Sequence, residues 1–519
     1  MPFDAVSYAL AIRHKPAIEP SYVILTEDGI VKAKNGMTGR IEFSHTDASR
    51  VLQYAIDSLP DDGSIFVKRG EYPLSKKVVL KDNITIIGEG LATRFKKLTN
   101  EATFYGMNVS NVILEKFFFD CNGLTGQPTT AYATAIGFDS DGTKPLYNIV
   151  LRDIKTYNGI GAHIHFWGID NYLVNVYIDV YLENVECDTN PKTDTISDPL
   201  LILDYVNGAT LVNCRAHDAP TEGGIAANGK NIELYNCSAW NCAQGLRIET
   251  FPRILGAGFV KVIGGKFFRN WRGIELFGGV FDSIRFGGRN VLIHGAAVYE
   301  NSDTGILLWG IGHHKNIVIS NCIIEHNGYP DREGIGILVQ GSPAEDILII
   351  GNVIRNNGFV RTECRNISLT APGTEKKVKR VTIIGNEIYD DRDYPYVRWG
   401  IEFREGTIED VVIVNNRFWG FYDEYITNSY GATIVNAVIR DNIGVTRLLT
   451  RNSGTATIPT GQTSVTVSHR LISAPTKVLV TPRANIGAVW VSARDATSFT
   501  IECSTTPESD VVVDWYAEL

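Results

Sequence analysis

Residues 230–341 decide the fold, because they repeat one unit four times. The copies are KNIELYNCSAWNCAQGLRIET (230–250), VKVIGGKFFRNWRGIELFGG (260–279), RNVLIHGAAVYENSDTGILLWG (289–310) and KNIVISNCIIEHNGYPDREGIGILVQG (315–341). Each copy is a β-rich run, a turn at Asn or Gly, and a second short strand that opens on Gly. The copies recur every 26 to 31 residues without a helical pattern between them, which is typical of a stacked solenoid. A coil of this length with two or three strands predicts an all-β chain folded as a right-handed parallel β-helix.

The segment before the repeat predicts how the solenoid begins. HTDASRVLQYAIDSLPDDG (45–63) has the apolar spacing of an amphipathic helix over 47–59, with Thr46 or Asp47 as its N-cap. Such a capping helix covers the apolar end that a solenoid would otherwise expose. Residues 1–44 contain DG and NG turns between alternating runs, which predict a short meander or hairpin that serves as an attachment region.

The pattern changes again near the C-terminus. Residues 454–519 alternate short strands with TGQ, SAP, RAN and PES turns, which predicts a small antiparallel β-sandwich. Its aromatic residues are expected in the core or a subunit contact, with a glycan-binding face as the alternative. The β-helix with its capping helix is therefore expected over 45–450.

Composition narrows the class of protein. The chain has 519 residues, 44% of them hydrophobic, and a formal net charge of −9, which disfavours a nucleic acid or an anionic membrane as partner. No apolar run is long enough to span a bilayer. The start, MPFDAVSYALAIRHKP, does not have the pattern of a signal peptide. Cys187, Cys214, Cys237 and Cys322 close strands, where they are expected to pack inside the coils.

One stretch resembles a known superfamily. DASRVLQYAIDSLPDDGSIFVKRGEYPLSKKVVLKDNITIIGEG (47–90) is similar to the entry segment of pectate-lyase-like β-helix proteins, which include polysaccharide lyases, glycoside hydrolases, epimerases and viral tailspikes. The resemblance implies a polysaccharide substrate. Similarity to tailspikes implies a homotrimer that is extracellular or virion-associated. The motifs of polygalacturonases and alginate epimerases do not occur, so the resemblance implies the fold rather than one reaction.

The outward positions of the Gly-led strands predict a functional face. Alternation in GLRIET turns Arg247 and Glu249 outward, and aligned strands stack about 4.8 Å apart. The first predicted column is His163, Ile202, Ala226, Arg247, Glu275, Leu307, Leu338 and Glu402. The second is His165, Asp204, Asn228, Glu249, Phe277, Trp309 and Gln340.

Paired carboxylates in these columns predict glycoside hydrolysis. Asp204 and Glu249 are two coils apart, about 9.6 Å by the strand spacing, which suits an inverting acid/base pair. Glu275 is a second candidate partner. The loop HDAPTEGG (217–224) adds Asp218 and Glu222 as further catalytic candidates. The predicted substrate-binding residues are His165, Asn228, Arg247, Phe277 and Trp309, the two rings being suited to stacking on sugars.

Other interpretations of these residues stay open. Arg247 and Glu275 form an exposed ion pair in the predicted register, and Asp204 and Glu249 are alternatively only solvated. His163 and His165 with Asp204 are a weaker candidate metal site, and we expect no required metal or cofactor. Ca²⁺ binding by the carboxylates of EIYDDRDYPYVRWGIEFREG (387–406) is the alternative.

The sequence therefore predicts a carbohydrate-active enzyme that cleaves a polysaccharide along the β-helix, with hydrolysis favoured. A polysaccharide lyase acting by β-elimination is the first alternative. A non-catalytic, glycan-binding adhesin of the tailspike kind is the second, and a structural surface protein is the third.

Overall fold

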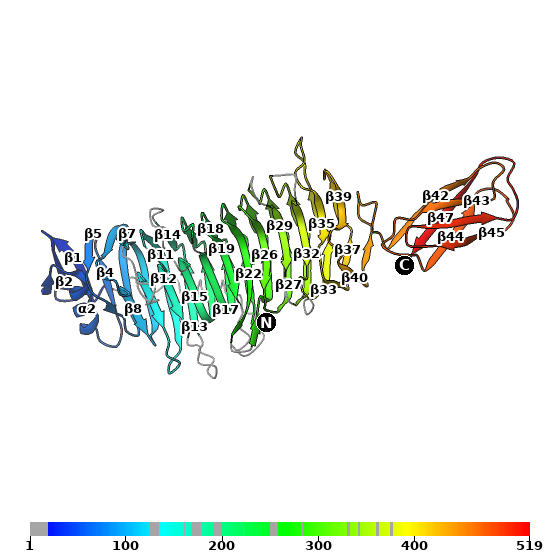
Figure 1. Ribbon diagram of the computed structural model, residues 1–519. Helices are drawn as coiled ribbons and strands as arrows, with labels where there is room; N and C mark the ends of the chain where they lie inside the picture. Colours follow the sequence, from blue (N-terminus) through cyan, green and yellow to red (C-terminus); the bar gives the residue numbers. More distant parts are fainter. Residues whose placement is uncertain are drawn as a thin grey trace. The chain divides into compact units, whose positions relative to one another are not determined.

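A computed structural model shows an almost entirely β chain (Figure 1). The fold is a right-handed parallel β-helix with an N-terminal capping helix and a C-terminal antiparallel β-sandwich, which confirms the prediction from the repeat. The residues that the structure describes are 19–123, 134–159, 161–168, 178–189, 199–221, 223–249, 258–281, 284–329, 333–340, 343–359, 363–373 and 377–519. No helix among these residues is long and apolar enough to cross a membrane.

The chain divides into two compact units. The N-terminal unit is Met1–Leu246 with Arg253–Gly258, and the C-terminal unit is Arg247–Pro252 with Phe259–Leu519. Within each unit the strands of successive coils pair in parallel, so the sequence repeat becomes a repeat of hydrogen-bonded strands.

Two coils of the C-terminal unit show the plan. The first coil contains β24 (Arg289–His294), β25 (Ala297–Tyr299) and β26 (Thr304–Gly310). The next contains β27 (His314–Ser320), β28 (Ile323–Glu325) and β29 (Ile335–Gln340), and each strand pairs in parallel with its counterpart. Alternate side chains of each strand are buried between the walls, where the apolar residues of the repeat form a continuous core.

The N-terminal end contains the expected meander and helix. β1 (Tyr22–Glu27), β2 (Ile30–Asn35) and β3 (Ile41–His45) are antiparallel neighbours. α2 (Ala48–Ser58) follows, and the side chain of Asp47 accepts a hydrogen bond from the backbone N–H of Ser49. Asp47 is therefore the N-cap.

Buried asparagines link the turns of neighbouring coils. Asn301 Nδ2 donates to Asn327 Oδ1 at 2.8 Å, and Asn327 Nδ2 donates to Asn357 Oδ1 at 2.8 Å. All three side chains are fully buried. The side-chain amides also form hydrogen bonds with backbone N–H and C=O groups. This asparagine ladder therefore provides hydrogen-bond partners for polar atoms that are buried away from water.

Asn327→Ala is expected to lower the free energy of unfolding by about 1–3 kcal/mol, because it leaves buried donors and acceptors without partners on both neighbouring coils. Chemical denaturation measures the difference. The exposed Asn100 gives the matched control, Asn100→Ala, which is expected to change stability little. Equal stability of the two variants would contradict a stabilising role for the ladder.

The cysteines expected in the core lie there. Cys187, Cys214, Cys237 and Cys322 are buried and none of the four forms a disulfide. Burial raises the pKa of the Cys322 thiol to about 11 and that of Cys187 well above its usual value. These four residues are therefore core residues with unreactive thiols.

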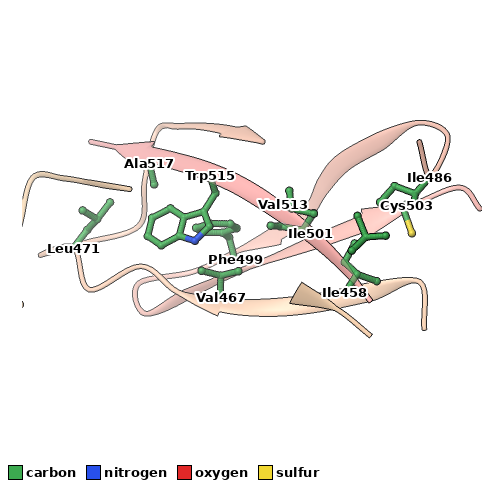
Figure 2. Close-up of a cluster of buried hydrophobic side chains, with 11 residues drawn as sticks. Ile458, Val467, Leu471, Ile486, Phe499, Ile501, Cys503, Val513, Trp515 and Ala517 are labelled. Carbon is green, nitrogen blue, oxygen red and sulfur yellow. The ribbon is translucent and has the colours of Figure 1, made fainter. Parts of the chain in front are cut away.

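The C-terminal module is a sandwich of two three-stranded antiparallel sheets. One sheet contains β42 (Arg451–Ile458), β47 (Val511–Glu518) and β44 (Lys477–Pro482), and the other contains β43 (Ser464–Ser468), β46 (Ser498–Cys503) and β45 (Val489–Arg494). Phe499 and Trp515 meet edge to face in the core between them (Figure 2). Trp490 is exposed.

Candidate functional site

One parallel sheet of the N-terminal unit holds part of the predicted site. It consists of β8 (Phe104–Met107), β10 (Ile136–Asp139), β12 (Ile164–Trp167), β15 (Leu201–Val212) and β17 (Gly223–Tyr235). Phe138 and Phe166 stack inside the coil, with ring centroids 5.4 Å apart. Their sequence neighbours therefore point to the outer face of the sheet.

The observed register defines one polar column on this outer face. Asp139 pairs with Trp167, Trp167 with Asp204, and Asp204 with Asn228. We call this set, together with Tyr105 and His165 beside it, the aspartate face. Asp139 and Asp204 are two strands apart, which places their backbones about 9.6 Å apart.

The register corrects two predicted positions. His165 is aligned with Ile202, not with Asp204, which instead faces Trp167. His163 precedes β12 and lies inside the coil, where its Nδ1 is 2.8 Å from the hydroxyl of Thr156. Burial lowers the pKa of His163 to about 4, so this histidine is a neutral core residue rather than part of an outward metal site.

Contacts across the aspartate face join its two carboxylates to different partners. The Tyr105 hydroxyl donates to Asp139 at 2.8 Å. Asn228 Nδ2 donates to Asp204 at 2.7 Å, and His165 Nε2 lies 3.4 Å from the same carboxylate. The structure thus brings His165, Asp204 and Asn228 together as predicted, although the register differs.

The two aspartates have different surroundings. Asp139 is 8% exposed, whereas the side chain of Asp204 is 24% exposed. Burial raises the pKa of Asp139, against the opposing effects of Tyr105, His165 and Lys77. Burial therefore favours the protonated form of Asp139, and Asp204 is the carboxylate with more access to solvent.

The remaining predicted residues form a second group in the C-terminal unit. Arg247 pairs with Glu249, and Arg272 Nη1 lies 2.7 Å from Glu275. Both carboxylates are almost fully buried. The prediction of an exposed Arg247–Glu275 pair is wrong, because Glu275 is only 2% exposed. Among the described residues, Glu275 pairs with Arg272 and Arg247 with Glu249. Arg272 starts β22 (Arg272–Phe281), and its long side chain reaches Glu275 along the same strand.

The two predicted stacking rings lie next to each other in this group. Phe277 is in register with Trp309, and their rings meet edge to face at 5.3 Å. The guanidinium of Arg247 lies over Phe277 at 4.6 Å and that of Arg272 over Trp309 at 4.7 Å. The indole N–H of Trp309 also donates to Glu275. A cation therefore covers one face of each ring.

The predicted acid/base pair of Asp204 and Glu249 is divided between the two units and stays a prediction. Asp218 lies elsewhere in the N-terminal unit, 2.8 Å from His217 Nδ1 at the end of β16 (Arg215–His217). Glu222 lies outside the described residues.

Asp218 belongs to a cluster whose ligand atoms resemble a metal site. Glu186, Asp188 and His217 place three such atoms within 4.8 Å of one another. The ammonium of Lys155 lies 2.6 Å from Glu186 and 3.0 Å from Asp188, however. The cluster thus already contains a cation of its own, and it functions as a half-buried ion-pair network.

Glu186 gives this network a definite pH dependence. The hydrogen bond with His217 and the ion pair with Lys155 outweigh burial and lower the pKa of Glu186 from 4.5 to about 2. A lowered carboxylate pKa stabilises the folded state above the unfolded pKa, and the contribution disappears as the pH falls to the folded value.

The destabilisation caused by Glu186→Gln is therefore expected to be complete at about pH 5.5, to shrink between about pH 4.5 and 2, and to vanish below that range. Urea unfolding at stepped pH measures it. Glu508→Gln, at an exposed glutamate of the sandwich, is the control. A difference from wild type that stays constant over this range would contradict the assignment.

The carboxylates expected to hold Ca²⁺ have protein partners. Asp390 pairs with Arg392 at 2.7 Å and accepts hydrogen bonds from the backbone N–H groups of Tyr396 and Val397. Glu402 is fully buried against Arg365 at 2.9 Å. Asp390 thereby anchors a loop and Glu402 a strand. The carboxylate oxygens that Ca²⁺ would need as ligands are already engaged in these contacts.

Sequence reasoning missed Asp139, Tyr105, Trp167 and Arg272. The signal for Asp139 was present in IGFD (136–139), where Ile136 and Phe138 alternate with the outward Gly137 and Asp139. Arg272 carried no such signal, because its contact with Glu275 depends on where a flexible side chain bends.

Comparison with solved structures finds many chains of similar fold, of which three are described. A mutant tailspike protein of E. coli bacteriophage HK620 in complex with a hexasaccharide matches with a TM-score of 0.59 and 12% identity, covering 91% of this chain and 89% of that one. The Azotobacter vinelandii mannuronan C-5 epimerase AlgE6 A-module matches with a TM-score of 0.49 and 16% identity over 76% of this chain and 95% of its own. The Dettilon tailspike protein matches with a TM-score of 0.47 and 12% identity over 96% and 94%.

At these identities the likeness is one of fold. No protein-family model and no curated protein matches the sequence.

Proposed function

We propose that the protein hydrolyses a polysaccharide on its aspartate face, with Asp139 as the general acid and Asp204 as the general base. The observation that carries the proposal is the placement of two carboxylates in one outward column, two strands apart, in different environments. Glycoside hydrolysis requires such a pair, one protonated and one ionised.

Asp139 suits the role of proton donor. Its burial raises its pKa and so favours the acid form that must protonate the leaving oxygen. The Tyr105 hydroxyl fixes the orientation of the carboxyl group.

Asp204 suits the role of base. It is more open to water, and the hydrogen bond from Asn228 holds one carboxylate oxygen in place. Inverting hydrolases separate their carboxyl groups by about 6.5–9.5 Å to admit a water molecule. A backbone separation of about 9.6 Å is close to the upper end of that range and well above the about 5–5.5 Å of retaining enzymes, so we propose inversion of configuration.

Groups around the pair suit a sugar chain. The indole of Trp167 lies in the column between the two aspartates and offers an apolar surface to a sugar ring. In the C-terminal unit, Phe277 and Trp309 retain the proposed role of a binding surface, with Arg247 beside them. Glu249, predicted as the partner of Asp204, and Glu275, its predicted reserve, stay candidate carboxylates, although each forms an ion pair with an arginine.

The fold relatives support the choice of substrate class and setting. A tailspike with the same fold is recorded in complex with a hexasaccharide. By analogy we propose a polysaccharide ligand, a homotrimer, and a location outside the cell or on a virion.

A screen for product ends tests the reaction. Neutral and acidic polysaccharides are incubated with the protein, and new reducing ends are measured together with absorbance near 235 nm, roughly where an unsaturated uronate absorbs. Hydrolysis is expected to release reducing ends without absorbance. Glycan binding without any release of ends would favour an adhesin instead.

One contact favours β-elimination as the second candidate function. His165 lies against Asp204 and could act as the proton-abstracting base that a lyase needs. Absorbance that rises in step with the reducing ends, and that is lost in His165→Gln, would select this reaction over hydrolysis.

Tyr105→Phe is expected to move the alkaline limb of the kcat profile to higher pH. The Tyr105 hydrogen bond lowers the pKa of Asp139, so its removal raises that pKa and keeps the acid protonated at higher pH. Initial rates across pH measure the limb. Tyr147→Phe, at an exposed tyrosine, is the control, and an unmoved or lowered limb in Tyr105→Phe would contradict the role of Asp139.

A further inference from the structure

A second motif repeats on neighbouring coils of the C-terminal unit. NGYPDREGI (327–335) and NGFVRTECR (357–365) share an aromatic residue after the glycine and a glutamate four positions later. Stacking of coils requires that turn and inward residues recur, but it places no such demand on exposed side chains. Tyr329 and Phe359 are 59% and 37% exposed, so the repetition of these rings needs another reason.

The two copies lie directly on each other. The Asn327–Asn357 hydrogen bond joins them, and a Cβ atom added to Gly328 would lie 3.1 Å from the Cα atom of Gly358. A Cβ atom at Gly334 would come within 2.3 Å of that same atom. The glycines thus bring the two backbones into contact and place the aromatic residues that follow on adjacent coils.

The glutamates of the two copies also meet. Ile335 is in register with Arg365, so Glu333 and Glu363 occupy equivalent positions two residues earlier. They share a cation, because Arg365 lies 2.7 Å from Glu333 and 3.6 Å from Glu363. A hydrogen bond from Tyr430 and the charges of Arg404 and Arg365 lower the pKa of Glu363 despite burial. This lowered pKa favours the ionised form of Glu363.

Two arginines pair with these glutamates. Arg365 also lies 2.9 Å from the buried Glu402. Arg404 lies 3.6 Å from Glu333 and 3.4 Å from Glu363. Three glutamates and two arginines give these described groups a formal net charge of −1, which disfavours an anionic ligand.

Another exposed aromatic residue borders these carboxylates. Tyr430 is 54% exposed, donates its hydroxyl hydrogen to Glu363, and has Arg404 5.0 Å over its ring. The surface thus combines three exposed rings with carboxyl and guanidinium groups that are within reach of them. Rings pack on the C–H faces of sugars, and carboxylates accept hydrogen bonds from hydroxyl groups.

We propose that Tyr329, Phe359, Tyr430 and the Glu333–Glu363 pair form a second glycan-binding site, which takes a neutral oligosaccharide. The proposal rests on the proposed function for its ligand class, but it requires no cleavage. An acidic glycan is disfavoured because its carboxylates would face Glu363 and Glu402, and the described charged groups of this surface have a formal net charge of −1.

Carboxyl footprinting tests the site directly. The Asp139→Asn variant, chosen to prevent cleavage, is treated with a carbodiimide and an amine, and labelling of Glu333, Glu363 and Glu508 is followed by mass spectrometry. The probes are maltohexaose, cellohexaose, xylohexaose and, as the acidic probe, a galacturonate hexamer. At least one neutral probe is expected to reduce labelling of Glu363 severalfold without changing the exposed Glu508.

Two further variants make the result specific. Tyr329→Ala combined with Phe359→Ala is expected to weaken the protection about tenfold in probe concentration, whereas Trp490→Ala, at an exposed ring of the sandwich, is expected to leave it unchanged. Absence of protection by every neutral probe, equal protection in the double variant, or protection by the acidic probe alone would overturn the proposal. Release of reducing ends by the wild-type protein is measured separately, so failure of this site and failure of the proposed hydrolysis are distinguishable.

Discussion

Asp139→Asn is expected to lower kcat by roughly 10²–10⁴-fold on any polysaccharide that the protein cleaves. The amide keeps the shape and the hydrogen bond with Tyr105 but has no proton to give to the leaving oxygen. KM is expected to change little, because substrate contacts remain. Initial rates of reducing-end release measure both constants.

Asp141→Asn is the matched control for this prediction. Asp141 is two residues away and exposed, and its carboxylate caps the turn at Thr143. It is expected to retain full activity. Asp204→Asn is expected to lose as much activity as Asp139→Asn, and the double variant little more, since acid and base act in one step. Full activity in either single aspartate variant would contradict the assignment of the pair.

Arg365→Ala is expected to destabilise the protein by about 3–5 kcal/mol, because it leaves a buried carboxylate without its cation. Glu402 and Arg365 are both almost completely buried, 2.9 Å apart, and hydrogen bonds from Ser368 and Ser429 to Glu402 complete the site. Chemical denaturation of the full chain measures the change in the unfolding transition.

Two comparisons identify the cause of that loss. Arg398→Ala breaks the exposed pair with Asp423 and is expected to cost at most about 1 kcal/mol. Arg365→Met combined with Glu402→Gln removes both buried charges and is expected to recover a large part of the lost stability. If the double variant were no more stable than Arg365→Ala, lost packing rather than an unpaired charge would explain the effect.

The architecture was predictable because a solenoid repeats its inward and turn residues. Apolar residues at alternate positions, asparagines and glycines recur once per coil. Residues 230–341 therefore predict the β-helix without any information on long-range contacts. The capping helix was predictable because Asp47 and the apolar positions after it have the spacing of an amphipathic helix.

The site was predictable only in part, because it depends on register and on side-chain reach. The side chain of His163, just before β12, points into the coil. The outward residues of β12 are therefore shifted by two positions from those predicted relative to β15, so that Trp167 aligns with Asp204. A Gly-led alignment does not contain that shift. The sequence nevertheless indicated that His165, Asp204 and Asn228 lie together. An error in the register between β12 and β15 still leaves these residues on neighbouring strands.

Ion pairing was the least predictable part. Arg247 pairs with Glu249 on its own strand, and Arg272 pairs with Glu275, three residues further along its strand. Long side chains have several rotamers that satisfy the same backbone register, so strand alignment alone does not select among partners.

The stereochemistry of the first product tests the central claim most directly. Cleavage of a responsive polysaccharide is followed by proton NMR from the first minutes, before the new reducing end mutarotates. Two aspartates whose backbones lie about 9.6 Å apart along one column predict an anomeric configuration opposite to that of the cleaved bond, and no signal at all from Asp204→Asn. Retention of configuration, an unsaturated uronate product, or unchanged cleavage by Asp204→Asn would contradict inverting hydrolysis on the aspartate face.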